Sequence, residues 1–174
     1  TEQLIAAGRL HEQYPDTYIQ THLSENKDEI DSTLSLCPDC QDYLEVYERA
    51  RLVTDRSIFG HCIHLSDSEC RRLVEAGSVV AHCPTSNLFL GSGLFDMQQA
   101  NRVGMQTVLA TDIGAGTSFS MLRTMGEAYK VQQLGGYPMS VFESLYKCTL
   151  GAAKALHLDD EIGCFGKGRK ADFI

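Results

Sequence analysis

Four short segments rich in β-branched and apolar residues alternate along the chain with longer segments whose apolar residues recur at helical spacing. The short segments predict strands at residues 17–22, 57–61, 78–83 and 106–112. Alternation of strands and helices is typical of a parallel sheet whose strands are joined by crossover helices. The sequence therefore predicts an α/β protein with a parallel sheet.

Between and after these strands, the apolar spacing predicts helices over residues 42–52, 66–76, 118–134 and 140–156. The second of these begins at Ser66 and has Glu69 three residues later, which is the pattern of a capping box. Gly77 follows its end, as is common at helix C-termini. The segment that begins at Pro84 is polar, and we expect a long loop there.

A polar residue closes each predicted strand: His22, His61, His82 and Asp112, at intervals of 39, 21 and 30 residues. A (β/α)8 barrel has units of about 31 residues, and the C-terminal ends of its strands form one face that carries the active site. An open, doubly wound sheet would also bring these residues to one edge, but the sequence has no nucleotide-binding glycine motif. We therefore expect three histidines and an aspartate at one rim of a barrel.

Two of these strand ends favour metal and proton chemistry. A neutral His22 can bind zinc, and Glu25, three residues later, can transfer protons without binding the metal; a surface loop with an incidental histidine and glutamate is the alternative. Asp112 ends an apolar strand and precedes a glycine-rich turn, and a buried carboxylate there is costly unless it is paired or binds a metal. Jointly, the strand ends predict a metal site. His82 is expected to be a structural histidine held in hydrogen bonds.

A single C-x-x-C motif joins Cys37 and Cys40. A structural zinc site would need a second pair, and a redox pair would open a helix after a strand; neither is found here. The base-flipping zinc deaminases carry H-x-E followed by P-C-x-x-C, whereas this chain has two residues between His22 and Glu25 and Leu36 before its first cysteine. We expect a loop with two incidental thiols.

Composition and charge limit the class of partner. The chain has 174 residues, 15 basic and 23 acidic side chains, and a net charge of −8, which argues against a nucleic-acid partner. No apolar run approaches the roughly 18 residues needed to span a bilayer, so no membrane partner is expected. Seven cysteines without a secretory signal favour reduced thiols and a cytoplasmic location. The chain begins without Met and ends where a strand is expected to start, at residues 168–174, so we expect a piece of a longer protein.

Three segments carry a resemblance to a known family: residues 22–26, 82–95 and 111–117. They resemble guanine deaminases, which are metal-dependent (β/α)8-barrel hydrolases of the amidohydrolase superfamily. The resemblance runs from near residue 10 to the end, and the segment after His82 and the glycine turn after Asp112 are its specific parts. It implies that residues 1–165 are the second half of the barrel, strands five to eight. Residues 166–174 would begin the exit towards a small β-domain, a motif shared throughout the superfamily.

The resemblance also implies roles for single residues. His22 would bind zinc, and Asp112 would bind zinc and take a proton from the attacking water. Glu25 would be the proton shuttle, and His61 would hold the water near the metal. His22, Glu25 and Asp112 would contact the substrate, and His82 would have no catalytic role. The two further zinc ligands of the family belong to an H-x-H motif of the first barrel strand, upstream of residue 1, so we expect the chain alone to be inactive.

The implied reaction of the full-length protein is hydrolysis of guanine to xanthine and ammonia, by a cytoplasmic homodimer acting on a small purine. Phe89 and Phe95, in the segment after His82, either stack on the purine or pack under the loop. One alternative is another aminohydrolase of this superfamily, acting on triazines, pterins or modified purines. The other alternative is a barrel fragment without catalysis.

Overall fold

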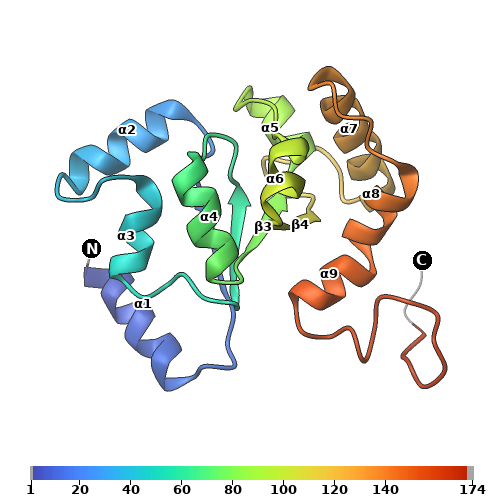
Figure 1. Cartoon of the computed structure of the whole chain (residues 1–174), viewed down its shortest axis with the longest axis horizontal. Helices are drawn as coiled ribbons and strands as arrows, with labels where there is room; N and C mark the ends of the chain where they lie inside the picture. The colour runs from blue at the N-terminus through green and yellow to red at the C-terminus, as the bar shows by residue number, and fades with distance from the viewer. Residues whose placement is uncertain (1, 172–174) are drawn as a thin grey trace.

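The structure, a computed structural model, describes residues 2–171. In chain order, its helices and strands are α1 (Glu2–Gln13), β1 (Ile19–Leu23), α2 (Lys27–Leu36), α3 (Tyr43–Arg49), β2 (Ser57–His61), α4 (Asp67–Glu75), β3 (Val79–His82), α5 (Pro84–Leu90), α6 (Met97–Val103), β4 (Gln106–Leu109), α7 (Met121–Leu134), α8 (Val141–Cys148) and α9 (Leu150–Ala155). Figure 1 shows the sheet at the centre, with α1–α4 on one side and α7–α9 on the other.

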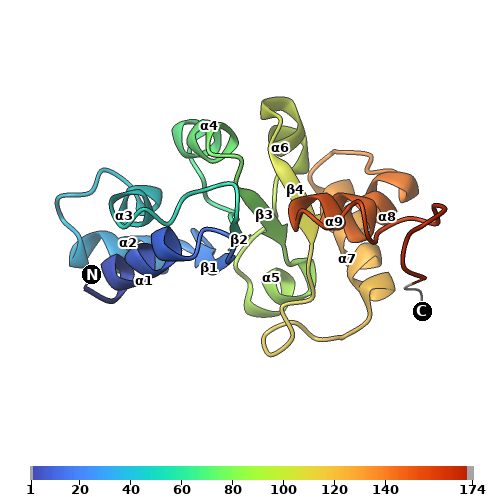
Figure 2. The same ribbon diagram turned by 90° about the horizontal axis from the view of Figure 1, so that it is seen from below.

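The four strands form one parallel sheet in the order β1-β2-β3-β4, as Figure 2 shows from below. The register places His22 opposite Gly60 and His82 opposite Leu109. Because neighbours in the sheet are also consecutive in the chain, each connection is a crossover of the kind that builds a (β/α)8 barrel. The α/β class and the partial barrel expected from the sequence are confirmed.

Local capping signals explain where several helices begin. Ser66 and Glu69 form the predicted capping box at the start of α4. Asn26 and Glu29 form a second capping box at the start of α2, a helix that the apolar spacing did not predict. The helix α6 was also not predicted, and it begins at Asp96, whose carboxylate accepts a hydrogen bond from the backbone of Gln99.

The segment after β3 is a helix, and the prediction of a long loop there was wrong. Pro84 occupies the first turn of α5, where its missing N–H costs nothing, and Gly91 ends the helix in the left-handed conformation. Because Pro84 turns the chain into α5, β3 ends at His82 and offers β4 no partner beyond it. The strand β4 therefore ends at Leu109, not at Asp112 as predicted.

Other boundaries also differ from the predictions. The first strand occupies Ile19–Leu23 rather than residues 17–22, and α7 begins at Met121 rather than at residue 118. The helix predicted over residues 140–156 is two helices, because Thr149 has φ −125° and ψ −104°, which is not helical. Residues 168–171 contain no strand, and residues 172–174, where the predicted strand would continue, lie outside the described residues. The division at residue 165 stays a prediction.

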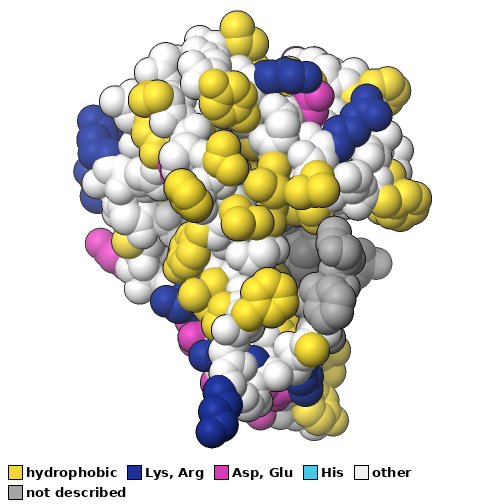
Figure 3. All heavy atoms as spheres, turned by 90° about the vertical axis from the view of Figure 1, so that its right-hand side faces the viewer, with side chains coloured by type: hydrophobic (Ala, Val, Ile, Leu, Met, Phe, Trp, Pro, Cys, Tyr) yellow, Lys and Arg dark blue, Asp and Glu magenta, His cyan; other side chains and the backbone are white. Residues whose placement is uncertain are grey.

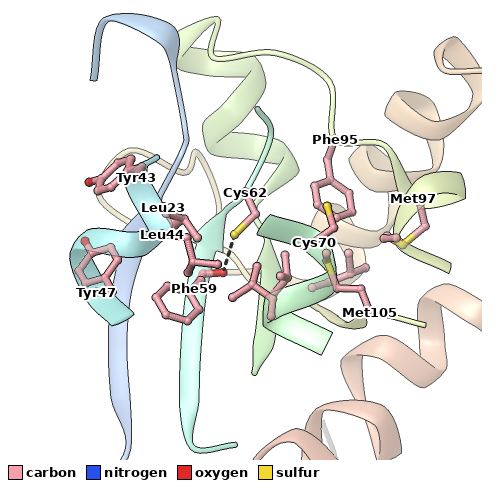
Figure 4. Packing of buried hydrophobic residues seen from close by; sticks show 14 of the residues in the cluster. Leu23, Tyr43, Leu44, Tyr47, Phe59, Cys62, Cys70, Phe95, Met97 and Met105 are labelled. Atoms are coloured by element: carbon pink, nitrogen blue, oxygen red, sulfur yellow. Dashed lines mark hydrogen bonds between the residues drawn. The ribbon is translucent and has the colours of Figure 1, made fainter. Parts of the chain in front are cut away.

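The larger core cluster lies between the sheet and the helices that cover it (Figure 4). Leu23 from β1, Phe59 from β2 and Val80 from β3 are fully buried in it, with Leu44 from α3 and Leu73 from α4. A smaller cluster covers the opposite face of the sheet and includes side chains from β3, β4 and α9, namely Val79, Ala81, Val108 and Ala155. Side chains of both faces are therefore buried along β3, as in a barrel strand.

His82 belongs to this interior rather than to a hydrogen-bonded rim. Its side chain is fully buried and stacks on Phe95, with 4.8 Å between the ring centroids. Neither ring nitrogen has a hydrogen-bond partner among the described residues, so the expectation of a hydrogen-bonded histidine was wrong. Burial lowers the pKa of His82 to about 3, helped by the positive charges of Lys147 and His61.

This pKa predicts a pH dependence of stability. The unfolded chain binds a proton at His82 below its ordinary pKa of 6.5, whereas the folded chain does not until about pH 3. The contribution of neutral His82 to the free energy of unfolding is therefore fully present above pH 6.5. It is lost as the pH falls towards 3, by about 2 kcal/mol between pH 7 and pH 5. We expect His82→Phe to remove this part of the loss, as measured by urea unfolding at both pH values. Equal losses in wild type and variant would contradict the prediction.

The face formed by α7–α9 carries many apolar side chains, as Figure 3 shows. The large exposed apolar residues of α7 and α8 are Leu122, Tyr129, Leu134, Val141, Phe142, Leu145 and Tyr146. Among the described residues, no helix combines the length and the hydropathy that crossing a membrane requires.

Candidate metal and catalytic site

Three of the predicted residues meet at the C-terminal edge of the sheet. His22 lies on β1, His61 ends β2, and Asp112 lies three residues beyond the end of β4. Each offers one ligand atom, and these three atoms lie within 4.8 Å of one another. The two imidazole rings are stacked, with 5.2 Å between their centroids. The strand ends therefore converge as the sequence predicted.

The backbone adopts a rare conformation where these residues leave the strands. Ser24, His61 and Asp112 have φ values of 49°, 67° and 49°, in the left-handed region that non-glycine residues rarely adopt. Such conformations cost about 1–3 kcal/mol each, and they cluster at functional sites. At β1, the Tyr47 hydroxyl donates to the backbone carbonyl of His22 and holds this turn against α3.

Glu25 directly precedes Asn26, the N-cap of α2, and its position follows from the cap of that helix. The Glu29 carboxylate of the capping box also accepts a hydrogen bond from the Glu25 N–H, at 2.8 Å. Glu25 Oε1 accepts a hydrogen bond from the Ser92 hydroxyl at 2.8 Å, and Glu25 Oε2 lies 3.6 Å from His61 Nε2. The carboxylate therefore lies beside the group of His22, His61 and Asp112 without being a member of it.

The orientation of His61 assigns its two nitrogens. Nδ1 lies 2.8 Å from the side-chain oxygen of Asn87, which only accepts hydrogen bonds, so Nδ1 carries a proton. In the neutral ring Nε2 then has a free electron pair, and it lies 3.6 Å from Glu25 Oε2 and 3.9 Å from Asp112 Oδ2. A ring fixed in this way can accept a proton or bind a metal at Nε2.

The loop that carries Asp112 depends on Gly116. The Asp112 carbonyl accepts a hydrogen bond from the Gly116 N–H at 2.6 Å, and Thr85 donates to the Thr111 carbonyl at 3.2 Å. A Cβ atom on Gly116 would lie 1.8 Å from the Thr111 carbonyl oxygen. A side chain at this position would therefore force the turn open.

We expect Gly116→Ala to lower the free energy of unfolding by about 1–3 kcal/mol, because the new methyl group collides with the backbone. Gly126→Ala is the matched control, since Gly126 lies on the exposed side of α7 and a Cβ there meets nothing within 4 Å. The control should be more stable than wild type by about 0.5–1 kcal/mol. Chemical unfolding measures both, and a neutral Gly116→Ala would show that the turn tolerates a side chain.

The donor set fits a zinc ion. Two imidazoles and a carboxylate are common zinc ligands, and a catalytic zinc site has at least three protein ligands. The Asn87 contact leaves His61 Nε2 free towards Asp112, as expected near a metal site. Among the residues that the structure describes, this is the one group of three or more ligands, and it includes no cysteine. Cys37 and Cys40 lie in a turn after α2, so the loop predicted there is confirmed, and the incidental role of the two thiols stays a prediction.

The geometry separates the two phenylalanines of the segment after β3. Phe95 is buried against His82, so it packs in the core and is not available to cover a substrate. Phe89 is 68% exposed on α5.

Two polar contacts of the site were not predicted from the sequence: Asn87 on His61 and Ser92 on Glu25. Both residues lie in the segment that resembles guanine deaminases, but no local pattern indicates their partners.

Comparisons with known proteins identify relatives of this chain. A guanine deaminase of Escherichia coli (strain K12) is 53% identical over 173 residues, which are 99% of this chain and 39% of that protein. A guanine deaminase of Mus musculus is 36% identical over 165 residues, covering 91% of this chain and 36% of that protein. The chain thus spans about 40% of the length of the relatives it matches.

Solved structures give the same result. The structure of E. coli guanine deaminase matches with a TM-score of 0.96 and 53% identity, over 98% of this chain and 40% of that one. Guanine deaminase from C. acetobutylicum, solved with bound guanine in the active site, matches with a TM-score of 0.87 and 31% identity, over 95% of this chain and 40% of that one. The sequence pattern of the amidohydrolase family matches residues 1–174. The chain therefore belongs to the amidohydrolase family.

Proposed function

We propose that the full-length protein carrying this chain hydrolyses guanine to xanthine and ammonia with a bound zinc ion. The observation that carries the proposal is the convergence of His22, His61 and Asp112 within 4.8 Å, with Glu25 Oε2 3.6 Å from His61 Nε2. The choice of guanine is supported by the E. coli guanine deaminase, which is 53% identical over 99% of this chain.

His22 and Asp112 would hold the zinc ion, together with two histidines upstream of residue 1. When bound, zinc lowers the pKa of a coordinated water from 15.7 towards about 7. The group of His22 and Asp112 also suits iron or cobalt, so metal analysis of the purified protein identifies the ion.

The residues of this chain would divide the proton transfers between them. Asp112 removes a proton from the attacking water, and His61 orients that water through Nε2. The oxygen then bonds to the purine carbon that carries the amino group. Glu25 gives a proton to the neighbouring ring nitrogen. It then takes the second water proton from the new hydroxyl group and gives it to the amine, so the carbon–nitrogen bond breaks with release of ammonia. The proton held by Asp112 then restores Glu25. Acid–base assistance of this kind accelerates a reaction by about 10²–10⁴-fold.

Other aminohydrolase substrates are the main alternative. The zinc-containing atrazine chlorohydrolase of Arthrobacter aurescens is 23% identical with a TM-score of 0.81, which shows a shared fold and no more. A barrel fragment without catalysis is the second alternative, but the intact group of His22, Glu25, His61 and Asp112 favours an enzyme. For the full-length protein we keep the predictions of a homodimer and a cytoplasmic location.

The test is a substrate profile of the full-length protein. Guanine, adenine, a pterin and an amino-triazine are supplied at equal concentration, and ammonia release is measured for each. We expect guanine to give the highest kcat/KM. A triazine or pterin in that place would reassign the substrate, and no ammonia from any of the four with the metal bound would favour the non-catalytic alternative.

A further inference from the structure

We propose that the segment from Asn87 to Ser92, at the end of α5, positions two side chains of the site, the water-orienting His61 and the proton-transferring Glu25. Asn87 fixes the His61 ring, and Ser92 fixes the Glu25 carboxylate. The inference rests on the proposed deaminase function, and it assigns roles to two residues outside the group of His22, His61 and Asp112. They are positioning residues, because they act through His61 and Glu25.

The contact of Asn87 with His61 lies in the interior. Asn87 and His61 are each 1% exposed, and 2.8 Å separates the Asn87 oxygen from His61 Nδ1. The Asn87 amide nitrogen has no hydrogen-bond partner among the described residues, so the bond to His61 is the one polar contact of this buried amide. A buried amide is costly, and an apolar side chain would fill the same space at lower cost. The amide therefore serves the His61 ring rather than the packing of α5.

Ser92 holds Glu25 in the same way as Asn87 holds His61, through a hydrogen bond to one of the two carboxylate oxygens. Ser92 Oγ donates to Glu25 Oε1 at 2.8 Å and leaves Oε2 directed to His61 Nε2 at 3.6 Å. A carboxylate with one oxygen held by a hydroxyl keeps the other oxygen free for proton transfer. The hydrogen bond joins residues 67 positions apart in the sequence, so it sets the distance between α2 and the end of α5.

The backbone couples the two positioning residues. Gly91 is left-handed, with φ 71°, and the Ser92 N–H donates to the Asn87 carbonyl at 2.9 Å. The Ser92 carbonyl lies 3.0 Å from His64 Nε2, and the His64 N–H donates to the carbonyl of Ser24, next to Glu25. Asn87 and Ser92 are thus held in one rigid turn that is tied to the end of β1. A shift of this turn would move His61 and Glu25 together.

The experiment uses the zinc-loaded full-length protein with guanine, and wild-type turnover is measured first. Asn87→Leu removes the acceptor and keeps the volume, and we expect kcat to fall by about 10–100-fold with little change in KM. Asn87→Asp keeps an acceptor and should recover most of this loss. Ser92→Ala removes the hydroxyl, and we expect a fall of about tenfold, the effect of one hydrogen bond to a charged group. Ser92→Thr should recover activity.

Ser86→Ala is the matched control, because Ser86 is buried on the same helix and its hydroxyl has no hydrogen-bond partner among the described residues. It should leave kcat unchanged. A second readout does not depend on turnover: ¹⁵N NMR of the labelled His61 ring should show the proton on Nδ1 in wild type and Asn87→Asp, and a tautomer mixture in Asn87→Leu.

Folded Asn87→Leu and Ser92→Ala variants with wild-type kcat and an unchanged His61 tautomer would overturn the proposal. If Asn87→Leu does not fold, Ser92→Ala against Ser92→Thr decides, since threonine keeps the hydroxyl that alanine removes. A wild-type protein that does not turn over guanine would contradict the proposed function instead. In that case the NMR tautomer still tests the role of Asn87.

Discussion

Replacing Glu25 by Gln in the full-length protein is expected to lower kcat for guanine by about 10²–10⁴-fold while the zinc content stays at the wild-type value. The amide has the size of the carboxylate and can still accept the hydrogen bond from Ser92, so the geometry of the site is kept. It cannot transfer protons between the water, the ring nitrogen and the leaving amine. Stopped-flow measurement of guanine loss, with metal analysis of the same sample, gives both values.

The control is Asp28→Asn, which removes a carboxylate from the exposed first turn of α2, three residues after Glu25. It should turn over guanine at the wild-type rate. If Glu25→Gln also retains full turnover, Glu25 is not the proton shuttle. If it loses zinc instead, Glu25 is a metal ligand and its assignment beside the metal group is wrong.

Replacing Asp112 by Ala is expected to remove both the metal and the activity. The carboxylate is the single anionic member of the group with His22 and His61, and it would also take the proton from the water. Without it the protein loses at least the 10²–10⁴-fold of acid–base assistance, with a further loss as zinc dissociates. Metal analysis after dialysis and the guanine assay measure the two effects separately.

Asp16→Ala is the control for this variant, because the Asp16 side chain is 99% exposed and precedes β1, at the end of that strand opposite to His22. It should keep the zinc content and the turnover of wild type. An Asp112→Ala protein that keeps its zinc would remove Asp112 from the ligands, even if the activity is lost.

The sequence predicts those parts of the fold that short-range signals determine. The strands predicted at residues 57–61 and 78–83 and the capping box of Ser66 and Glu69 follow from apolar runs and caps. The structure confirms them, with the second strand one residue shorter at each end. The helix α5 carries equally local signals, a proline in its first turn and a glycine after its end. The polar residues between the proline and the glycine nevertheless led to the prediction of a loop, because Thr, Ser and Asn are typical of loops as well as of buried helix faces.

The candidate site also has a part that the sequence predicts and a part that it does not. The convergence of His22, His61 and Asp112 could be predicted because the C-terminal ends of parallel strands lie at one edge of the sheet. An error of a few residues in a strand boundary does not change this. The partners of these residues could not be predicted. The contact of Asn87 with His61 spans 26 residues, and it depends on how α5 packs over the sheet. The burial of His82 under Phe95 has the same origin, because Phe95 reaches it from the segment beyond α5.

The most direct test of the central claim is the rate of guanine loss by the full-length protein before chelation, after chelation, and after zinc is restored. The account predicts xanthine and ammonia in equal amounts from the zinc-loaded protein, loss of turnover when zinc is removed, and recovery when it is returned. Guanine turnover that continues unchanged in the zinc-free protein would contradict the account. So would a zinc-loaded protein that leaves guanine intact.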